Sequence, residues 1–291
     1  LVGANHYTVR NLRYNTVVID EAGQAIEPGC WIPILKGRKV ILAGDHCQLS
    51  PTIKSAEAAK NGLSETLLSK CVARFPDAVV MLEEQYRMHR VIMGFSSRMF
   101  YDNRLTAHPS VADHLLTGHE LAFTYIDTAG CGFDEKADTT SISNPEEAAL
   151  LFKHLTRLVQ DLATRHTVAD FPTIAIISPY RGQIAVLKEQ LEHATALQPY
   201  LHAIAVNTID SFQGQERDIV CISLARSNSD GEIGFLSDTR RMNVAMTRAR
   251  KKLIVVGDSA TLSQHPFYAE MIAYAETHNA YKSAWEEDWA M

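Results

Sequence analysis

The 291-residue sequence predicts an α/β fold of parallel sheets flanked by helices. Short apolar runs bounded by polar turns recur along the chain, and they are continuous rather than alternating, as in strands buried on both faces of a parallel sheet. Segments of helical periodicity lie between several of these runs, and such an alternation is typical of α/β proteins. The predicted strands are Val17–Ile19, Val40–Ala43, Ala122–Ile126, Ile174–Ile177, Ala203–Val206, Ile219–Leu224 and Leu253–Val256.

Three segments have the period of a helix: Pro145–Leu162, Gln183–Leu191 and Asp238–Arg250. The first has a strong start signal, because Asn144 can cap the helix, a proline takes the first helical position and two glutamates follow. The polar segment 130–143 is predicted to be a surface loop.

The length predicts about two domains of ~150 residues each. The sequence predicts the domain boundary near residues 75–84. Residues 1–78 hold too few strands for a complete nucleotide-binding domain, so we expect them to form the C-terminal half of one, and residues 79–291 to form a whole second domain.

Composition excludes several classes of protein. The sequence has 46% hydrophobic residues and no apolar run near the ~20 residues of a membrane span, so we expect a globular protein without membrane contact. The five cysteines are scattered and never form CxxC, which predicts reduced thiols in an intracellular (cytoplasmic) protein and neither an iron–sulfur cluster nor structural zinc. The net charge is −6, but residues 240–252 contain six basic and no acidic residues, enough for a local nucleic-acid contact.

Asp20 and Glu21 directly follow the first predicted strand. Ligands of open α/β sheets gather at the carboxyl ends of the strands. Phosphoryl transfer to water needs Mg²⁺ near the phosphates and a group that orients the water, and Asp20 suits the metal role and Glu21 the water role. Taken alone, the pair could be two solvated acids at a strand end.

Gln48 lies in the turn after the second predicted strand, at the same expected edge. Its amide can bond the γ-phosphate or the attacking water and so report whether the third phosphate is present. The alternative is an ordinary turn, because Gly44-Asp45 is common turn chemistry.

Arginines and one aromatic residue add phosphate and base chemistry. Tyr86 can stack on a base, and Arg87 can clamp phosphate oxygens with its planar guanidinium. Arg241 and Arg248 are seven residues apart in the predicted helix and should share a face, from which they could act as arginine fingers. The alternative is a solvated basic face or a nucleic-acid stripe.

Two further polar segments follow predicted strands. In the first, Gly214 permits a tight turn, Glu216 could bond a ribose, and Thr208 and Ser211 suit a phosphate backbone.

In the second, Ser178, Tyr180 and Arg181 end a strand and begin a helix, a place that favours phosphates. Either segment alone could be an ordinary polar loop.

Six motifs in fixed order resemble the later motifs of superfamily 1 helicases: IDEAGQ (19–24), AGDHCQLSP (43–51), EQYRMH (84–89), SPYRGQ (178–183), DSFQGQE (210–216) and RRMNVAMTRAR (240–250). The resemblance runs from about Val17 to Asp258. It is greatest to the superfamily 1B branch that contains the nonsense-mediated-decay and immunoglobulin mu-binding-protein helicases. The family's first motif, GxxxxGK[ST], does not occur in the 291 residues.

The resemblance implies one partial and one complete RecA-like domain of the P-loop NTPase fold, which use ATP and Mg²⁺ to move 5′ to 3′ along single-stranded DNA or RNA. It implies Asp20 for Mg²⁺, Glu21 as catalytic base and Gln48 as γ-phosphate sensor. It also implies Arg87 and Arg248 on the γ-phosphate, Tyr86 beside adenine and Glu216 near the ribose. Gly214 and Arg241 are further expected nucleotide-binding residues. We expect a monomer, and negligible ATP hydrolysis by the 291 residues alone.

Two other functions remain open at this stage. The chain could be a non-enzymatic nucleic-acid or protein-binding module derived from a helicase, although such a module has no use for Asp20, Glu21, Gln48, Arg87 and Arg248 together. It could also belong to a nuclease-fused member of the branch, but no cysteine cluster or extra acidic motif supports that reading.

Overall fold

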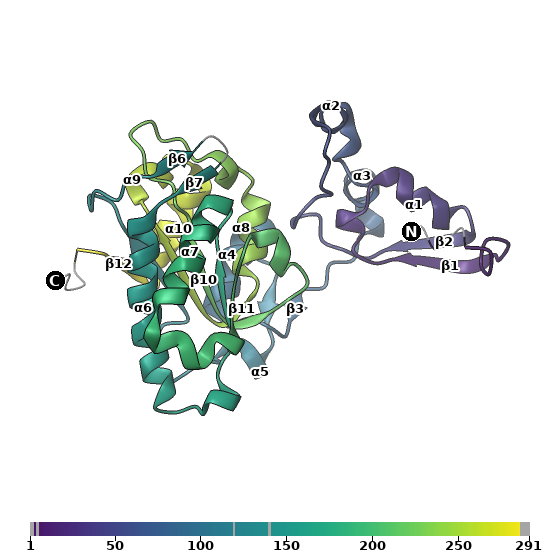
Figure 1. Cartoon of the computed structure of the whole chain (residues 1–291). Coiled ribbons are helices and arrows are strands. Elements are labelled where there is room, and N and C mark those ends of the chain that lie inside the picture. Colours follow the sequence, from purple (N-terminus) through teal and green to yellow (C-terminus); the bar gives the residue numbers. More distant parts are fainter. Residues whose placement is uncertain (1–2, 4–5, 119, 139–140, 286–291) are drawn as a thin grey trace. The chain divides into compact units, whose positions relative to one another are not determined.

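The computed structural model describes residue 3 and residues 6–118, 120–138 and 141–285. The chain divides into two compact units, Leu1–Met81 and Leu82–Met291 (Figure 1).

The first unit is built on two parallel strands, β1 (Tyr14–Ile19) and β2 (Gly37–Leu42), connected through the 3₁₀ turn η2 (Ala22–Gln24) and helix α1 (Glu27–Ile34). Their register runs from Tyr14 opposite Gly37 to Ile19 opposite Leu42. After β2 follow α2 (Ala56–Ala58), η3 (Ala59–Leu63), α3 (Leu67–Arg74) and η4 (Pro76–Ala78).

The core of this unit is small, and it joins β1, η2, α1 and α3 through Ile19, Ala22, Cys30, Leu67 and Leu68. The prediction that these strands are buried on both faces is wrong within the described chain. Val18 is 61% exposed and Ile41 43% exposed, because the helices of the unit cover the opposite side of the strand pair.

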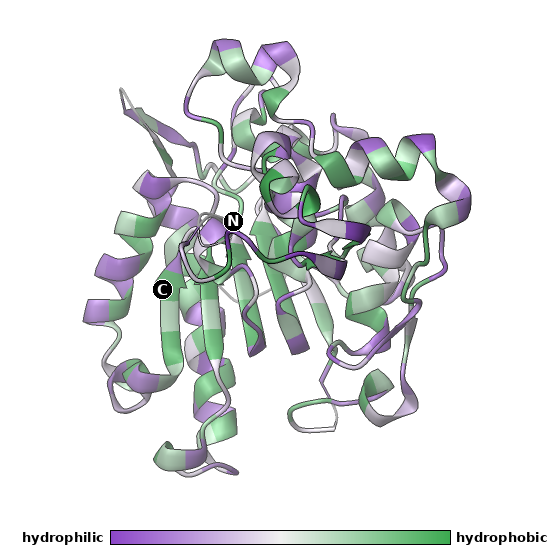
Figure 2. Cartoon of the chain, turned by 90° about the vertical axis from the view of Figure 1, so that its right-hand side faces the viewer, coloured by the Kyte–Doolittle hydropathy of each residue, from purple (hydrophilic) through white to green (hydrophobic). Residues whose placement is uncertain are grey.

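The second unit contains a six-stranded parallel sheet in the order β12-β5-β11-β10-β8-β9. The strands are β5 (Phe123–Asp127), β8 (Ile174–Ile177), β9 (Ile204–Asn207), β10 (Arg217–Ser223), β11 (Ala249–Gly257) and β12 (Tyr281–Ser283). Every residue of β8 is completely buried, so both faces of the sheet are covered (Figure 2 shows the hydrophobic strands between helices).

Two groups of helices cover this sheet. The long helices α6 (Pro145–Ala163) and α7 (Arg181–His193) pack on each other and on the core between them and the strands. Helix α4 (Arg90–Phe100) packs on α8 (Thr239–Met246) and α10 (Pro266–Thr277). The minor elements are β3 (Glu84–Gln85), β4 (Thr106–Ala107), α5 (Pro109–Ala112), β6 (Lys136–Asp138), β7 (Ser141–Ser143), η5 (Val168–Asp170), η6 (Thr195–Ala203), η7 (Ile209–Phe212), η8 (Gly234–Ser237) and α9 (Ser259–Leu262).

The structure confirms the α/β class with parallel sheets, and all seven predicted strands are present. Asn144 caps α6 as predicted, with its Oδ1 accepting a hydrogen bond from Glu147 N at 2.9 Å. The predicted surface loop 130–143 instead contains the antiparallel pair β6–β7. In the described part of the chain, no helix is both long and apolar enough to cross a membrane.

The helix predicted over Asp238–Arg250 is too long. It ends at Met246, where the Thr247 hydroxyl donates to Asn243 O at 2.7 Å and so satisfies a carbonyl of the last turn. Strand β11 begins three residues after Met246, at Ala249.

Candidate active-site residues

Asp20 and Glu21 lie at the carboxyl end of β1, and both are exposed. Glu21 adopts a left-handed backbone conformation, with φ 52° and ψ 36°, which is costly for a residue with a Cβ and concentrates at functional sites. Asp20 Oδ1 accepts a hydrogen bond from Glu21 N at 2.9 Å, and Glu21 Oε2 accepts one from Gln24 Nε2 at 2.7 Å. Both carboxylates border an open pocket of about 430 Å³.

The turns after β1 and β2 are in direct backbone contact. Ala22 N donates to Ala43 O at 2.8 Å, so the two turns continue the pairing of the strands. A Cβ on Gly23 would lie 2.6 Å from Asp45 O, and one on Gly44 would lie 2.9 Å from both Ala22 N and Gly23 N. Glycine at both positions therefore brings the carboxylate turn and the glutamine turn together.

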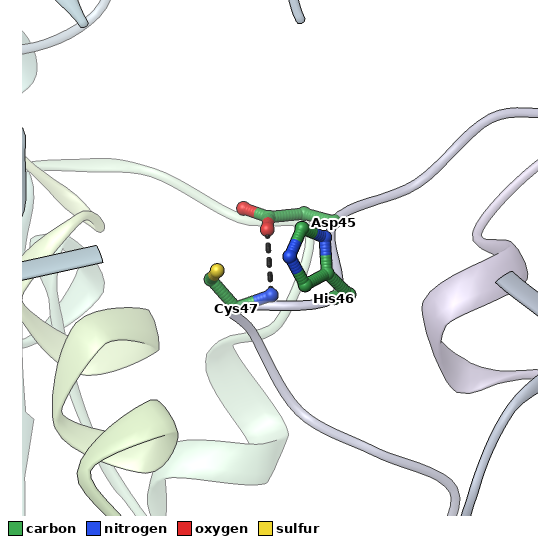
Figure 3. A group of neighbouring side chains, drawn as sticks. All are labelled: Asp45, His46 and Cys47. Atoms are coloured by element: carbon green, nitrogen blue, oxygen red, sulfur yellow. Dashed lines mark hydrogen bonds between the residues drawn. The ribbon is translucent and has the colours of Figure 1, made fainter. Parts of the chain in front are cut away.

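Asp45 organises the second turn. Its Oδ1 accepts a hydrogen bond from Cys47 N at 2.8 Å, and its Oδ2 accepts one from Gln48 Nε2 at 2.8 Å (Figure 3 shows the first of these). The half-buried Gln48 amide is thus held in place at the sheet edge that carries Asp20. The donor atoms of Asp45, His46 and Cys47 lie within 4.8 Å of one another, but both oxygens of Asp45 already accept hydrogen bonds inside the turn.

Arg87 and Glu216 come together in the second unit. Arg87 Nε lies 2.9 Å from Glu216 Oε2, and Arg87 Nη1 donates to Thr247 O at 3.2 Å. Arg250 Nη1 lies 3.6 Å from the other carboxylate oxygen of Glu216. Glu216 directly precedes β10 and Arg250 is the second residue of β11, so this charged group lies at the amino ends of those strands rather than at the carboxyl ends.

Arg248 is only 3% exposed and lies outside α8. Its guanidinium folds back on the end of that helix, with Nε donating to Val244 O at 3.0 Å and Nη1 donating to Gln215 O at 3.2 Å. The expectation that Arg241 and Arg248 share a helical face is therefore wrong, because the helix ends between them. Arg241 instead contacts Asp210, with Nη1 3.1 Å from Oδ2.

Tyr86 and Gly214 are both accessible. Tyr86 is 62% exposed, its ring stacks on His108 at a centroid distance of 4.3 Å, and its hydroxyl donates to Glu84 Oε2 at 2.7 Å. This hydrogen bond raises the pKa of Tyr86. Gly214 has φ 71°, as a tight turn requires, and open space surrounds the position of a Cβ.

The predicted nucleic-acid residues divide into two groups. Arg181 and Ser211 are exposed and Thr208 is half-buried, all after the carboxyl ends of β8 and β9. Ser178 is completely buried and Tyr180 is 2% exposed, with its hydroxyl donating to Ile233 O at 2.9 Å. Burial disfavours these two side chains as nucleic-acid contacts and favours a structural role for both.

The sequence reading missed a buried polar core beneath this edge. Glu147 is completely buried and accepts hydrogen bonds from the Ser223 hydroxyl and from Ala225 N at 3.0 Å. Gln183 is also completely buried, and its Nε2 donates to Ser223 Oγ at 2.8 Å. Burial raises the pKa of Glu147 to about 7. No spacing in the sequence distinguishes these side chains from exposed ones.

Comparison with known proteins identifies the family. Residues 63–260 match the model of an AAA domain, and residues 1–56 match a second AAA-domain model. This chain belongs to the AAA domains of superfamily 1 helicases. The predicted family is confirmed, while the roles of individual side chains stay predictions.

Curated relatives of this superfamily 1 chain come from distant organisms. It is 40% identical to the DNA-binding protein SMUBP-2 of Rattus norvegicus over 94% of its length and 28% of that protein. It is 35% identical to a Regulator of nonsense transcripts 1 homolog of Arabidopsis thaliana over 95% of its length and 22% of that protein. An uncharacterised ATP-dependent helicase of Methanocaldococcus jannaschii is 36% identical over 92% of the chain and 40% of that protein. The chain thus spans well under half of each relative.

Proposed function

We propose that the whole protein is an ATP-dependent helicase or translocase that moves 5′ to 3′ on single-stranded DNA or RNA, and that this chain supplies side chains for hydrolysis. The observation that carries the proposal is the contact between the turns after β1 and β2. Gly23 and Gly44 set the strained Glu21 beside the loop that holds Gln48. The relatives include an ATP-dependent helicase and a DNA-binding protein, and this supports the same function.

The exposed carboxylate of Asp20 suits Mg²⁺, which proteins commonly hold through one or two carboxylates together with substrate phosphates. In the proposed mechanism Asp20 holds the metal of an Mg²⁺–ATP complex. Water attacks the γ-phosphorus, the bond to the oxygen that bridges the β- and γ-phosphates breaks, and ADP leaves. Glu21 accepts the proton of the attacking water, and the Gln48 amide bonds that water or the γ-phosphate. Bound Mg²⁺ would neutralise charge that develops on the phosphates.

In the second unit, Arg87 stabilises charge on the γ-phosphate, Tyr86 lies beside adenine, and Glu216 bonds the ribose. Arg248 joins Arg87 on the γ-phosphate once its guanidinium turns away from the carbonyls of Val244 and Gln215, to which it donates in this structure. The exposed Arg181 and Ser211 and the half-buried Thr208 contact the phosphate backbone of the single strand. Backbone contacts of this kind carry affinity without sequence preference.

We further propose that the protein works as a monomer in a reducing intracellular compartment. All five cysteines are free thiols, which is the support for the compartment.

Strand displacement by the whole protein with ATP and Mg²⁺ tests the function. Duplexes with a 5′ or a 3′ single-stranded tail should differ, with displacement only from the 5′ tail. Displacement only from the 3′ tail would overturn the direction. ATP turnover that no single strand stimulates would overturn the motor function itself.

A further inference from the structure

An exposed aromatic side chain lies on the loop that leaves the carboxyl end of β10. Phe235 is 64% exposed and sits in the short 3₁₀ turn η8. A large ring exposed to solvent does not contribute to the core. It can serve as a binding surface if the loop holds it in a fixed position.

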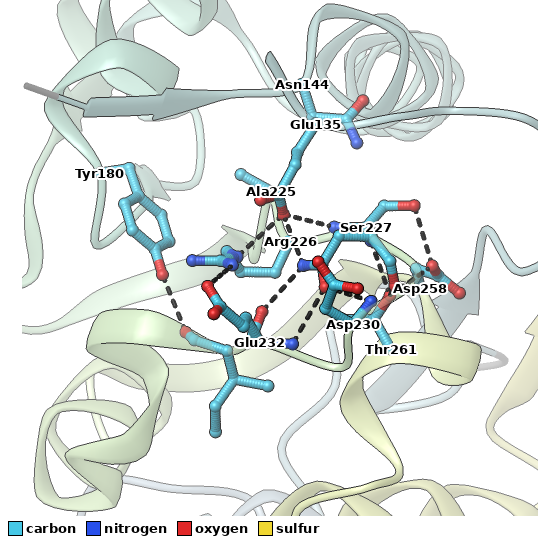
Figure 4. A network of polar contacts seen from close by, with 12 residues as sticks. Glu135, Asn144, Tyr180, Ala225, Arg226, Ser227, Asp230, Glu232, Asp258 and Thr261 are labelled. Atoms are coloured by element: carbon cyan, nitrogen blue, oxygen red, sulfur yellow. Dashed lines mark hydrogen bonds and ion pairs between the residues drawn. The ribbon is translucent and has the colours of Figure 1, made fainter. Parts of the chain in front are cut away.

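The loop is held from beneath by a buried charged side chain (Figure 4). Arg226 is 6% exposed, and its Nε lies 2.8 Å from Glu135 Oε2. Asn228 Nδ2 donates to Glu232 O at 2.9 Å, which closes the loop on itself. Breaking a buried ion pair by removing one partner is strongly destabilising, so Arg226 and Glu135 favour a single conformation of this loop.

The residue before Phe235 completes the support. Gly234 has φ 52°, and a Cβ there would lie 2.6 Å from Arg226 Nη1 and 3.0 Å from Tyr180 Oη. The Tyr180 hydroxyl donates to Ile233 O at 2.9 Å, and the Tyr180 and Phe235 ring centroids are 5.7 Å apart. The buried Tyr180 thereby has a role, which is to fix the turn that presents Phe235.

The surroundings are those of a single-strand path. The next residue along the chain from Tyr180 is the exposed Arg181, whose side chain has no hydrogen-bond or ion-pair partner among the described residues. The order β10-β8-β9 places the Phe235 loop, Arg181 and Ser211 after the carboxyl ends of three neighbouring strands. Arg181 directly follows Tyr180, whose ring centroid lies 5.7 Å from that of Phe235, and a cation so placed matches a phosphate followed by a base.

We infer that Phe235 is a stacking platform for one unpaired base, with Arg181 on an adjacent phosphate. This inference rests on the proposed nucleic-acid function and adds a base contact to it. A ring held in advance loses little side-chain freedom when a base stacks on it, and stacking accepts any base because each has a π-face.

Binding of fluorescent oligonucleotides to the whole protein without nucleotide tests this platform. Phe235→Ala should weaken binding of an oligo-dT strand about tenfold or more, on the usual size of base–aromatic stacking. Binding of an otherwise identical abasic strand should not change, because it offers phosphates alone. Phe235→Trp should keep wild-type affinity for oligo-dT, which shows that the loop still folds.

Two control variants separate base stacking from charge attraction and from the loss of any exposed aromatic ring. Arg181→Ala should weaken binding of both the oligo-dT and the abasic strand, and it should make the affinity less dependent on salt concentration. Phe235→Ala should leave the salt dependence of the affinity unchanged. Trp285→Ala removes another ring, 67% exposed after the edge strand β12, and should leave both affinities unchanged.

Each remaining outcome is decisive. If the wild-type protein binds neither strand, the proposed nucleic-acid function fails together with the platform. If the wild type binds oligo-dT and Phe235→Ala binds it equally well, only the platform fails. Equal binding with a lower melting temperature for Phe235→Ala would assign the ring to packing against another part of the protein, and would also overturn the inference.

Discussion

Arg87 and Glu216 are 129 residues apart in sequence and form an ion pair of 2.9 Å between Nε and Oε2. We assign Arg87 to the γ-phosphate and Glu216 to the ribose, so Glu216 could act on ATP directly or by orienting Arg87. A Glu216 variant should change different kinetic parameters in the two cases.

If Glu216 bonds the ribose, Glu216→Gln should raise the KM for ATP several-fold, because a hydrogen bond to a charged group is replaced by a weaker one. The variant should also lose any preference for ATP over 2′-deoxy-ATP. Steady-state kinetics of the whole protein with both nucleotides check this. A reduced kcat with the preference intact would show instead that Glu216 acts only by orienting Arg87.

Arg248 should be needed for both chemistry and stability. Arg248→Ala should lower kcat by about 10³ or more, on the magnitude of an arginine finger. It should also lower the free energy of unfolding by about 1–3 kcal/mol, because the buried carbonyl of Val244 loses its donor. Turnover and thermal unfolding measured on one sample separate the two effects, and a preserved kcat would remove Arg248 from the nucleotide site.

Gly23 should tolerate no side chain. Gly23→Ala places a Cβ 2.6 Å from Asp45 O, and overpacking of this kind costs about 1–3 kcal/mol of unfolding free energy. It should also reduce ATP turnover, because the Glu21 and Gln48 turns must move apart. Gly62→Ala is the control, since it has a left-handed φ of 94° but open space around its Cβ, and it should lower stability without affecting turnover. Full activity of Gly23→Ala would contradict the proposed importance of this contact.

Stability should fall as pH rises through the titration of Glu147. Burial raises its pKa from 4.5 to about 7, so the folded state favours the protonated form. Its stabilising contribution is complete below pH 4.5 and is lost as pH approaches 7, a change of about 3 kcal/mol.

Glu147→Gln should therefore show a flatter dependence of unfolding free energy on pH than wild type between pH 4.5 and 7.5. Glu146→Gln is the matched control, because that neighbouring carboxylate is 44% exposed and should leave the wild-type curve unchanged. Denaturant unfolding at several pH values checks both variants, and parallel curves for Glu147→Gln and wild type would contradict the assignment.

The strands were predictable because both faces of a continuous apolar run need burial. A parallel sheet covered by helices buries both faces of Ile174–Ile177 and Leu253–Val256. The cap at Asn144 was predictable because a capping side chain, a proline and two glutamates follow one another in the sequence. The end of α8 was not, because Thr247 stops the helix through a side-chain hydrogen bond that periodicity does not reveal. Motif positions identified the family, but burial of Tyr180 depends on Ile233, which is 53 residues away in sequence.

Turnover by Glu21→Gln tests the central claim most directly. The variant keeps the size and hydrogen-bonding capacity of Glu21 but cannot accept a proton from water. In the whole protein, the rate of ATP hydrolysis stimulated by single strands should fall by roughly 10² or more, while ATP binding persists. Glu65→Gln changes another exposed carboxylate of the first unit and should hydrolyse ATP at the wild-type rate. Near-normal turnover by Glu21→Gln would contradict the assignment of the catalytic base, and with it the site at the ends of β1 and β2.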